Sequence, residues 1–235
     1  MTGIALAGLG RMANERALPC AIPLPHLLGA MLCFVLFGWA LQEPLPWPMR
    51  MVAQALAAVA YLRLVGGPGG WFPQGVFARR WRWALQVWLA AMPGLYGILR
   101  LNDFLLEQVF AASSGNLVRS QLLEMSAFDF VWALPAILLL MPALEEVLFR
   151  GYLFRMLVAA PAAALTKRRF SLLGALFSSS MVFALAHPRG MWLPALYLGC
   201  LFAWVDWRGG DLRLNILVHC WHNAVFLVFA MCVSS

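Results

Sequence analysis

Two adjacent glutamates, Glu145 and Glu146, stand in a stretch of the chain that is otherwise almost wholly apolar. Arg150 follows four residues after Glu146, so on a helix these two side chains share a face and can pair, whereas Glu145 is turned roughly 100° away. An ionisable group inside an apolar span is costly unless it is paired or functional. We therefore expect Glu146 and Arg150 to form a structural ion pair, which leaves Glu145 available for chemistry.

Histidines supply the other half of a possible site. His187 ends one apolar block, and His219 lies in the last block, four residues before Asn223 on the same helix face. A carboxylate in an apolar pocket and an imidazole can activate a water, while a second imidazole and a carboxamide can stabilise an oxyanion. These are the groups needed to hydrolyse an amide within a membrane.

Other interpretations of the same residues stay open. His187 precedes Pro188 at a span end, and His219 with Asn223 can hydrogen-bond between helices. Glu145, His187 and His219 could bind zinc with one open position, although the chain contains no HExxH motif. A transporter would show repeated halves around its intramembrane charges, and no internal repeat is evident.

The composition requires that apolar helices position these residues. Hydrophobic residues make up 63% of the chain and charged residues only 11%, where a soluble domain carries about 25%. The apolar residues form blocks of about the length that spans a bilayer as a helix. We predict an all-α, polytopic bundle of about seven spans around a polar intramembrane cavity, with spans near 24–42, 46–66, 83–99, 128–160, 170–187, 190–206 and 212–232.

Two stretches depart from simple spans. Residues 101–124 mix charges with apolar side chains at helical spacing, so we expect one or two interfacial helices there. Residues 128–160 would form a helix of roughly 48 Å, longer than the hydrocarbon layer. We therefore expect this helix to extend into water or to break at Pro135 or Pro142.

Charge placement predicts the topology. The net charge is +7, and arginines together with the only lysine, Lys167, lie mainly between the apolar blocks. The positive-inside rule then places the N-terminus in the cytoplasm and the C-terminus outside. No basic face with stacking aromatics is present, which argues against a nucleic-acid partner.

Three motifs occur in order along the second half of the chain. "EEVLFR" (145–150) fits EExxxR, "FALAH" (183–187) fits FxxxH, and "HCWHN" (219–223) fits HxxxN. These motifs lie in three apolar blocks, and in this order they resemble the motifs of the CPBP family. That family comprises the Rce1-type CAAX prenyl endopeptidases and the bacterial Abi proteins. The resemblance implies a glutamate-type intramembrane protease without an obligatory metal or other cofactor.

The resemblance also implies residue roles. Glu145 is expected to be the general base on water with His187 as its partner, and His219 with Asn223 to form the oxyanion site. Glu146 and Arg150 are expected to be the structural pair, in agreement with their shared helix face. Phe183 is expected to be a packing residue.

The resemblance covers about residues 140–230. We expect one membrane domain, 1–235, in which 1–125 holds variable N-terminal spans with the interfacial segment and 126–235 is the catalytic core. Size and composition look bacterial, so we expect the bacterial inner membrane. Some bacterial relatives process C-terminal sorting tails, like exosortases and myxosortases, so the expected substrate is a membrane-anchored protein cut near its C-terminus. The alternative is a non-catalytic scaffold or a bacteriocin-immunity protein.

Overall fold

The computed structural model of the chain describes residues 75–110, 126–159 and 168–232. Within these ranges every regular element is a helix and no strand is present. The prediction of an all-α protein is therefore confirmed for the described ranges. The first two predicted spans, about 24–42 and 46–66, lie outside them.

Helix α4 (Val76–Phe110) is longer than the span predicted at about 83–99. The expectation of a separate interfacial helix beginning at residue 101 is wrong for residues 101–110, which continue α4. The physical reason is that no glycine or proline follows Gly97 in this stretch, so nothing in the sequence ends the helix. Residues 111–125, the rest of the predicted interfacial segment, lie outside the described ranges.

The long fourth block forms one uninterrupted helical run. The expected break at Pro135 or Pro142 is wrong, because the backbone accommodates both prolines by changing its hydrogen-bond pattern. Met141 donates its N–H to the carbonyl of Ala136, five residues back, as in a π-helix. The run consists of α6 (Ala127–Pro135), the π-helix η1 (Ala136–Leu140), α7 (Met141–Glu146), the π-helix η2 (Val147–Phe154) and α8 (Arg155–Ala159).

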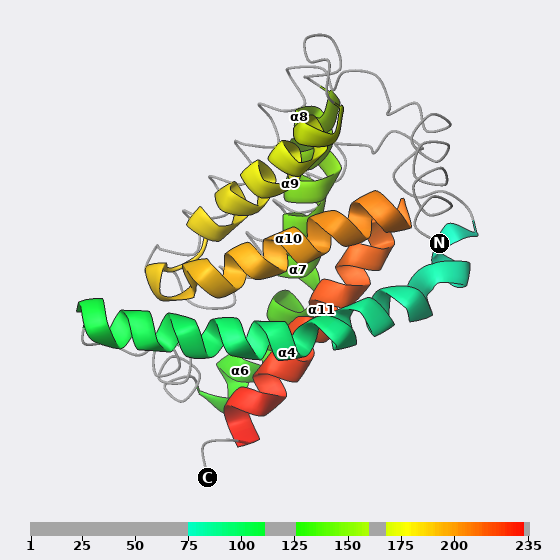
Figure 1. Cartoon of the computed structure of the whole chain (residues 1–235). Helices are drawn as coiled ribbons and strands as arrows, with labels where there is room; N and C mark the ends of the chain where they lie inside the picture. Colours follow the sequence, from blue (N-terminus) through cyan, green and yellow to red (C-terminus); the bar gives the residue numbers. More distant parts are fainter. Residues whose placement is uncertain (1–74, 111–125, 160–167, 233–235) are drawn as a thin grey trace, which may run out of the picture.

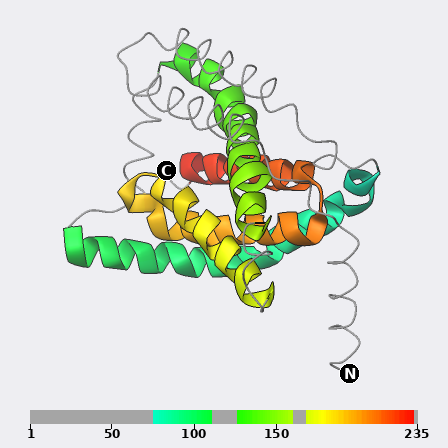
Figure 2. The same cartoon turned by 90° about the horizontal axis from the view of Figure 1, so that it is seen from above.

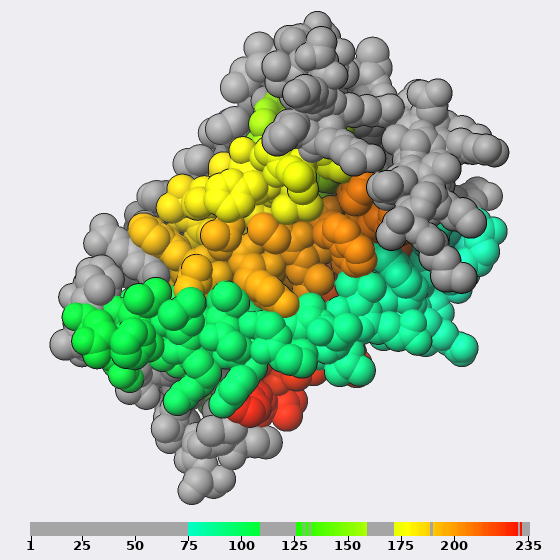
Figure 3. All heavy atoms as spheres, viewed as in Figure 1, coloured from blue at the N-terminus to red at the C-terminus, as the bar shows by residue number. Residues whose placement is uncertain are grey.

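The last three predicted spans correspond to three helices of the structure. They are α9 (Arg168–Leu185), α10 (Trp192–Gly209) and α11 (Leu212–Cys232), and the short 3-10 helix η4 (Arg189–Met191) precedes α10. Figures 1 and 2 show α9 and α10 as a hairpin, with α4 beside α10, and Figure 1 shows α11 crossing behind α4. In Figure 3, α9, α10 and α4 lie side by side on one face.

The helices pack through apolar side chains, as helix association in membranes requires. The core between α4, α10 and α11 includes Trp88, Phe202 and Val218. At one end of this core Trp83 of α4 packs against Trp204 of α10, with ring centroids 5.8 Å apart. These contacts fix α4 and α11 against α10, the helix that faces the polar cluster described below.

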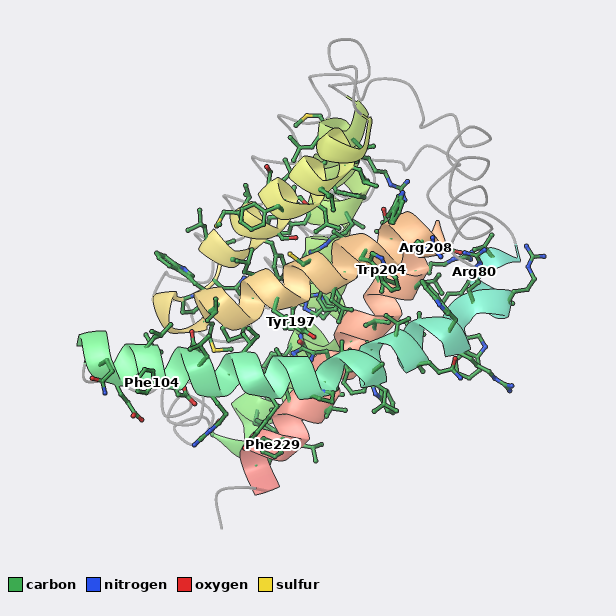
Figure 4. The ribbon with its side chains drawn as sticks, viewed as in Figure 1. Arg80, Phe104, Tyr197, Trp204, Arg208 and Phe229 are labelled. Carbon is green, nitrogen blue, oxygen red and sulfur yellow. The ribbon has the colours of Figure 1, made fainter. Side chains whose placement is uncertain are left out.

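Two of the described helices are long and apolar enough to cross a bilayer, judged by length and composition. They are Val76–Gln108 and Leu212–Phe229, and a shorter apolar helix covers Leu172–Leu185. Large apolar side chains on their outer faces are exposed, including Phe104 and Phe229, which Figure 4 labels. The count of about seven spans stays a prediction, because it depends on residues outside the described ranges.

Candidate active site

Glu145, Glu146, Arg150 and His219 form the polar cluster. In it, the imidazole of His219 lies between the two adjacent glutamates. Its Nδ1 atom is 2.8 Å from Oε1 of Glu146, and its Nε2 atom is 3.7 Å from Oε2 of Glu145. A carboxylate oxygen only accepts, so Nδ1 carries the hydrogen and donates it to Glu146. The longer distance to Glu145 exceeds a hydrogen bond. His219 is therefore fixed on one edge, and its other edge faces the second carboxylate.

Glu146 and Arg150, which the four-residue spacing pairs, are in contact. Arg150 Nη1 lies 3.2 Å from Glu146 Oε1, and Arg150 Nη2 donates to the carbonyl of Gly199 at 3.1 Å. The guanidinium carbon also lies 4.3 Å from the ring centroid of Phe183 and 5.3 Å from that of Phe202. The charge is thus held by a carboxylate, a carbonyl and the faces of aromatic rings, as a buried cation needs.

The two glutamates have different surroundings. The Glu146 side chain is 0% exposed and its Oε1 atom accepts from both Arg150 and His219, whereas the Glu145 side chain is 15% exposed. The rotation of about 100° between them does not take Glu145 out of the cluster, because His219 presents opposite edges of its ring to the two carboxylates. Glu146 is committed to fixed partners, and Glu145 has access to a reactant.

His187 lies at the end of α9 and touches the cluster through an aromatic ring. Its Nδ1 atom donates to the carbonyl of Phe183 at 2.8 Å, so Nε2 is the ring atom left for a reactant. The Phe183 ring centroid is 4.5 Å from that of His187 and 6.1 Å from that of His219. Phe183 is buried and packs between the two imidazoles. Among the described residues, no hydrogen bond or ion pair joins His187 to Glu145.

Asn223 makes a contact that the spacing did not predict. Its Nδ2 atom donates to the backbone carbonyl of Ile137 at 2.9 Å. That carbonyl has no helical donor, because the N–H of Met141 bonds to Ala136 and the next residue, Pro142, has no N–H. The asparagine amide therefore satisfies a carbonyl that the proline leaves open. Its expected part in an oxyanion site stays a prediction and would use the second amide hydrogen.

The zinc alternative requires Glu145, His187 and His219 to converge on one point. In the part of the chain that the structure describes, no group of three or more His, Cys, Asp or Glu side chains is arranged to hold a metal ion. These three residues accordingly form no preformed ligand set.

Several contacts around the cluster involve residues that the motifs do not include. Phe202 stacks against His219 with ring centroids 4.7 Å apart. A Cβ atom placed on Gly199 would lie 2.9 Å from Cβ of Ser180, so this glycine permits the close approach of α9 and α10. Asn102 of α4 binds the turn after His187, as described below. For the contacts of the two asparagines the sequence signal is a proline four or five residues after the carbonyl, Pro194 for Gly190 and Pro142 for Ile137, and it does not identify the partner.

The helices and the cluster define an all-helical membrane bundle with a buried carboxylate–imidazole site. Residues 127–225 match the family model described as Type II CAAX prenyl endopeptidase Rce1-like. This part of the chain is similar to that family of membrane proteases, which confirms the resemblance carried by the three motifs. The matched range is less than half of the chain and contains all the motif residues. No curated protein and no solved structure matches the chain.

Proposed function

We propose that the chain is an intramembrane endopeptidase that cuts a membrane-anchored protein near its C-terminus, using a water activated by Glu145. The observation that carries this proposal is the difference between the two glutamates. Glu146 is fully buried and bonded to Arg150 and His219, while Glu145 is partly exposed and makes no hydrogen bond to its neighbouring imidazole. A general base needs access to its water, and only Glu145 has it.

In the proposed reaction Glu145 takes a proton from water as the water oxygen bonds to the scissile carbonyl carbon. The free Nε2 of His187 accepts a hydrogen bond from the same water and orients it. Negative charge develops on the carbonyl oxygen, where Nε2–H of protonated His219 and the second amide hydrogen of Asn223 donate. Glu146 stabilises that imidazolium through Nδ1. The C–N bond then breaks, and the proton on Glu145 passes to the leaving amine.

The substrate class follows from the membrane setting. A site between spans meets peptide bonds at the membrane anchor of a protein more readily than bonds in a soluble domain. We propose an unprenylated C-terminal anchor segment, and a location in the bacterial inner membrane with the N-terminus in the cytoplasm and the C-terminus outside. A prenylated CAAX tail is the alternative substrate that the description of the family suggests.

The test compares the C-terminal peptides of membrane proteins from cells that carry the wild-type protein, Glu145→Gln or Glu107→Gln. Glu107 is an exposed glutamate of α4 and serves as the control. Glu145→Gln should leave anchor tails uncut, with a rate loss of at least about 100-fold, and should keep wild-type thermal stability. Glu107→Gln should cut normally.

Two outcomes would refute the proposal. If cells with Glu145→Gln process every tail normally, Glu145 is not the general base. Equal loss of folded protein in Glu145→Gln and Arg150→Ala, without a separate loss of cutting, would support the scaffold alternative. If prenylated tails accumulate rather than unprenylated ones, the substrate is a prenylated tail, and the proposed reaction at Glu145 is unchanged.

A further inference from the structure

Helix α4 lies outside the range that matches the family, yet it binds the turn that follows His187. Asn102 of α4 is buried, with 5% of its surface exposed, and its Nδ2 atom donates to the carbonyl of Gly190 at 2.8 Å. The bond joins residues 88 positions apart in the chain. Figures 1 and 2 show the C-terminal half of α4 beside the turn between α9 and α10.

The Gly190 carbonyl is open to an outside donor for a local reason. The residue four positions later, which would donate to it in an α-helix, is Pro194, and proline has no N–H. The carboxamide of Asn102 takes that place. Asn223 serves the carbonyl of Ile137 in the same way, so two asparagines satisfy carbonyls whose helical donor is replaced by a proline.

Two hydrogen bonds on either side of Gly190 connect the turn to His187 and Pro188. The carbonyl of His187 accepts from Nε1 of Trp192 at 2.9 Å, and the carbonyl of Pro188 accepts from the N–H of Met191 at 2.8 Å. These two bonds close a loop of a few residues around Gly190. A loop so short has little freedom to absorb a shift at one point without moving its other residues.

We infer that Asn102 is a positioning residue that holds His187 at the candidate site through the turn at Gly190. This inference rests on the proposed function for its catalytic consequence. Its structural part is independent of it, because the geometry of the turn is measurable in a protein with no known substrate. The assignment also makes α4 part of the site's scaffold, although the family match begins only at residue 127.

Hydrogen exchange of the purified full chain tests the structural part. Asn102→Ala should speed exchange of the backbone amides of residues 186, 187 and 189–192 by about tenfold, the factor that one lost hydrogen bond gives. Tyr197→Phe is the matched control, because it removes a bond of the same 2.8 Å length between α10 and α4, from the Tyr197 hydroxyl to the carbonyl of Ala91. The control should leave the turn unchanged.

The catalytic part is tested by the rate at which the protein cuts the anchor tails that Glu145→Gln leaves uncut. Asn102→Ala should lower kcat by about 10-fold to 100-fold at constant KM, because it displaces a catalytic group and not the substrate. Asn102→Gln, which keeps the amide donor, should restore part of the rate, whereas Asn102→Asp, which cannot donate to a carbonyl, should not. A purely structural role would lower the amount of folded protein and leave kcat per folded molecule unchanged.

The outcomes separate this inference from the proposed function. If Asn102→Ala and Tyr197→Phe change exchange equally, or if neither changes it at residues 186–192, the inference is wrong. If the turn loosens in Asn102→Ala while cutting stays normal, the positioning role is wrong. If Glu145→Gln retains cutting, the proposed function fails, and the exchange result still decides whether Asn102 holds the turn. If Asn102→Ala does not accumulate, the Gln and Asp variants carry the same comparison.

Discussion

Oε1 of Glu146 accepts two hydrogen bonds, one from Nδ1 of His219 at 2.8 Å and one from Arg150 at 3.2 Å. The sequence indicates only the second of these, because Glu146 and Arg150 share a helix while His219 is 73 positions away. The carboxylate therefore does more than neutralise the arginine. It fixes the orientation and tautomer of the imidazole that faces Glu145.

The first prediction concerns the charge of Glu146. Glu146→Gln keeps the shape and an acceptor oxygen but leaves the Arg150 guanidinium buried without its counter-charge. Removing one partner of a buried pair costs about 3–5 kcal/mol, so the unfolding temperature should fall strongly. Glu145→Gln removes a charge of the same kind from a partly exposed site and should cost under about 1 kcal/mol. Thermal unfolding of both variants in detergent measures the difference.

A double variant checks the cause. Glu146→Gln combined with Arg150→Met removes both charges and keeps a similar side-chain volume, so it should recover part of the stability lost in Glu146→Gln. A double variant that unfolds at a lower temperature than both single variants would contradict the ion-pair explanation.

The second prediction concerns Asn223 and Pro142. Asn223→Ala leaves the Ile137 carbonyl without a donor and should cost about 1 kcal/mol. In a Pro142→Ala background that cost should nearly vanish. If the helix keeps its π geometry, the new N–H at residue 142 reaches Ile137, and if the helix becomes regular, the N–H of Met141 does.

A double-mutant cycle on unfolding free energies measures this coupling. Pro135→Ala is the matched control, because the carbonyl that Pro135 leaves without an α-helical donor is that of Val131 and not that of Ile137. The cost of Asn223→Ala should therefore be unchanged in the Pro135→Ala background. Equal costs in all three backgrounds would show that Asn223 does not serve the carbonyl that Pro142 leaves open.

These contacts show which features the sequence could predict. Apolar blocks gave the last three helices to within a few residues, and the four-residue spacing gave the pair of Glu146 and Arg150. Both features depend on neighbours along one helix. The approach of His219 to both glutamates depends on how separate helices pack, which spacing alone does not specify.

The wrong predictions also arise because contacts between separate helices cannot be read from the local sequence. A proline in an apolar helix indicates a break when only the local chain is considered, because it removes a donor and clashes with the preceding turn. Here π-helical turns and the amide of Asn223, 86 positions from Ile137, compensate for the loss. Asn102 was assigned to a surface segment because its neighbours are charged, yet it is buried against Gly190. In each case the deciding contact is with a residue that is distant in the sequence.

The third prediction concerns Gly199, whose carbonyl accepts from Arg150 at 3.1 Å. A Cβ atom at this position would lie 2.9 Å from Cβ and 3.0 Å from Cα of Ser180, and the second contact is with backbone that no side-chain rotation can relieve. Gly199→Ala should therefore push α9 away from α10 and cost about 1–3 kcal/mol. Because α9 carries Phe183 and ends at the turn with His187, cutting should fall together with stability.

The control for Gly199 is Gly174, a glycine of α9 whose added Cβ would meet nothing within 4 Å. Gly174→Ala should raise stability by about 0.5–1 kcal/mol, because alanine restricts the unfolded chain more than glycine does. The two variants make the same chemical change, so opposite shifts of the unfolding temperature would identify steric contact between the helices as the cause. If Gly199→Ala is as stable as Gly174→Ala, the two helices do not approach as closely as the structure places them, and the support that Gly199 gives to Arg150 would need another explanation.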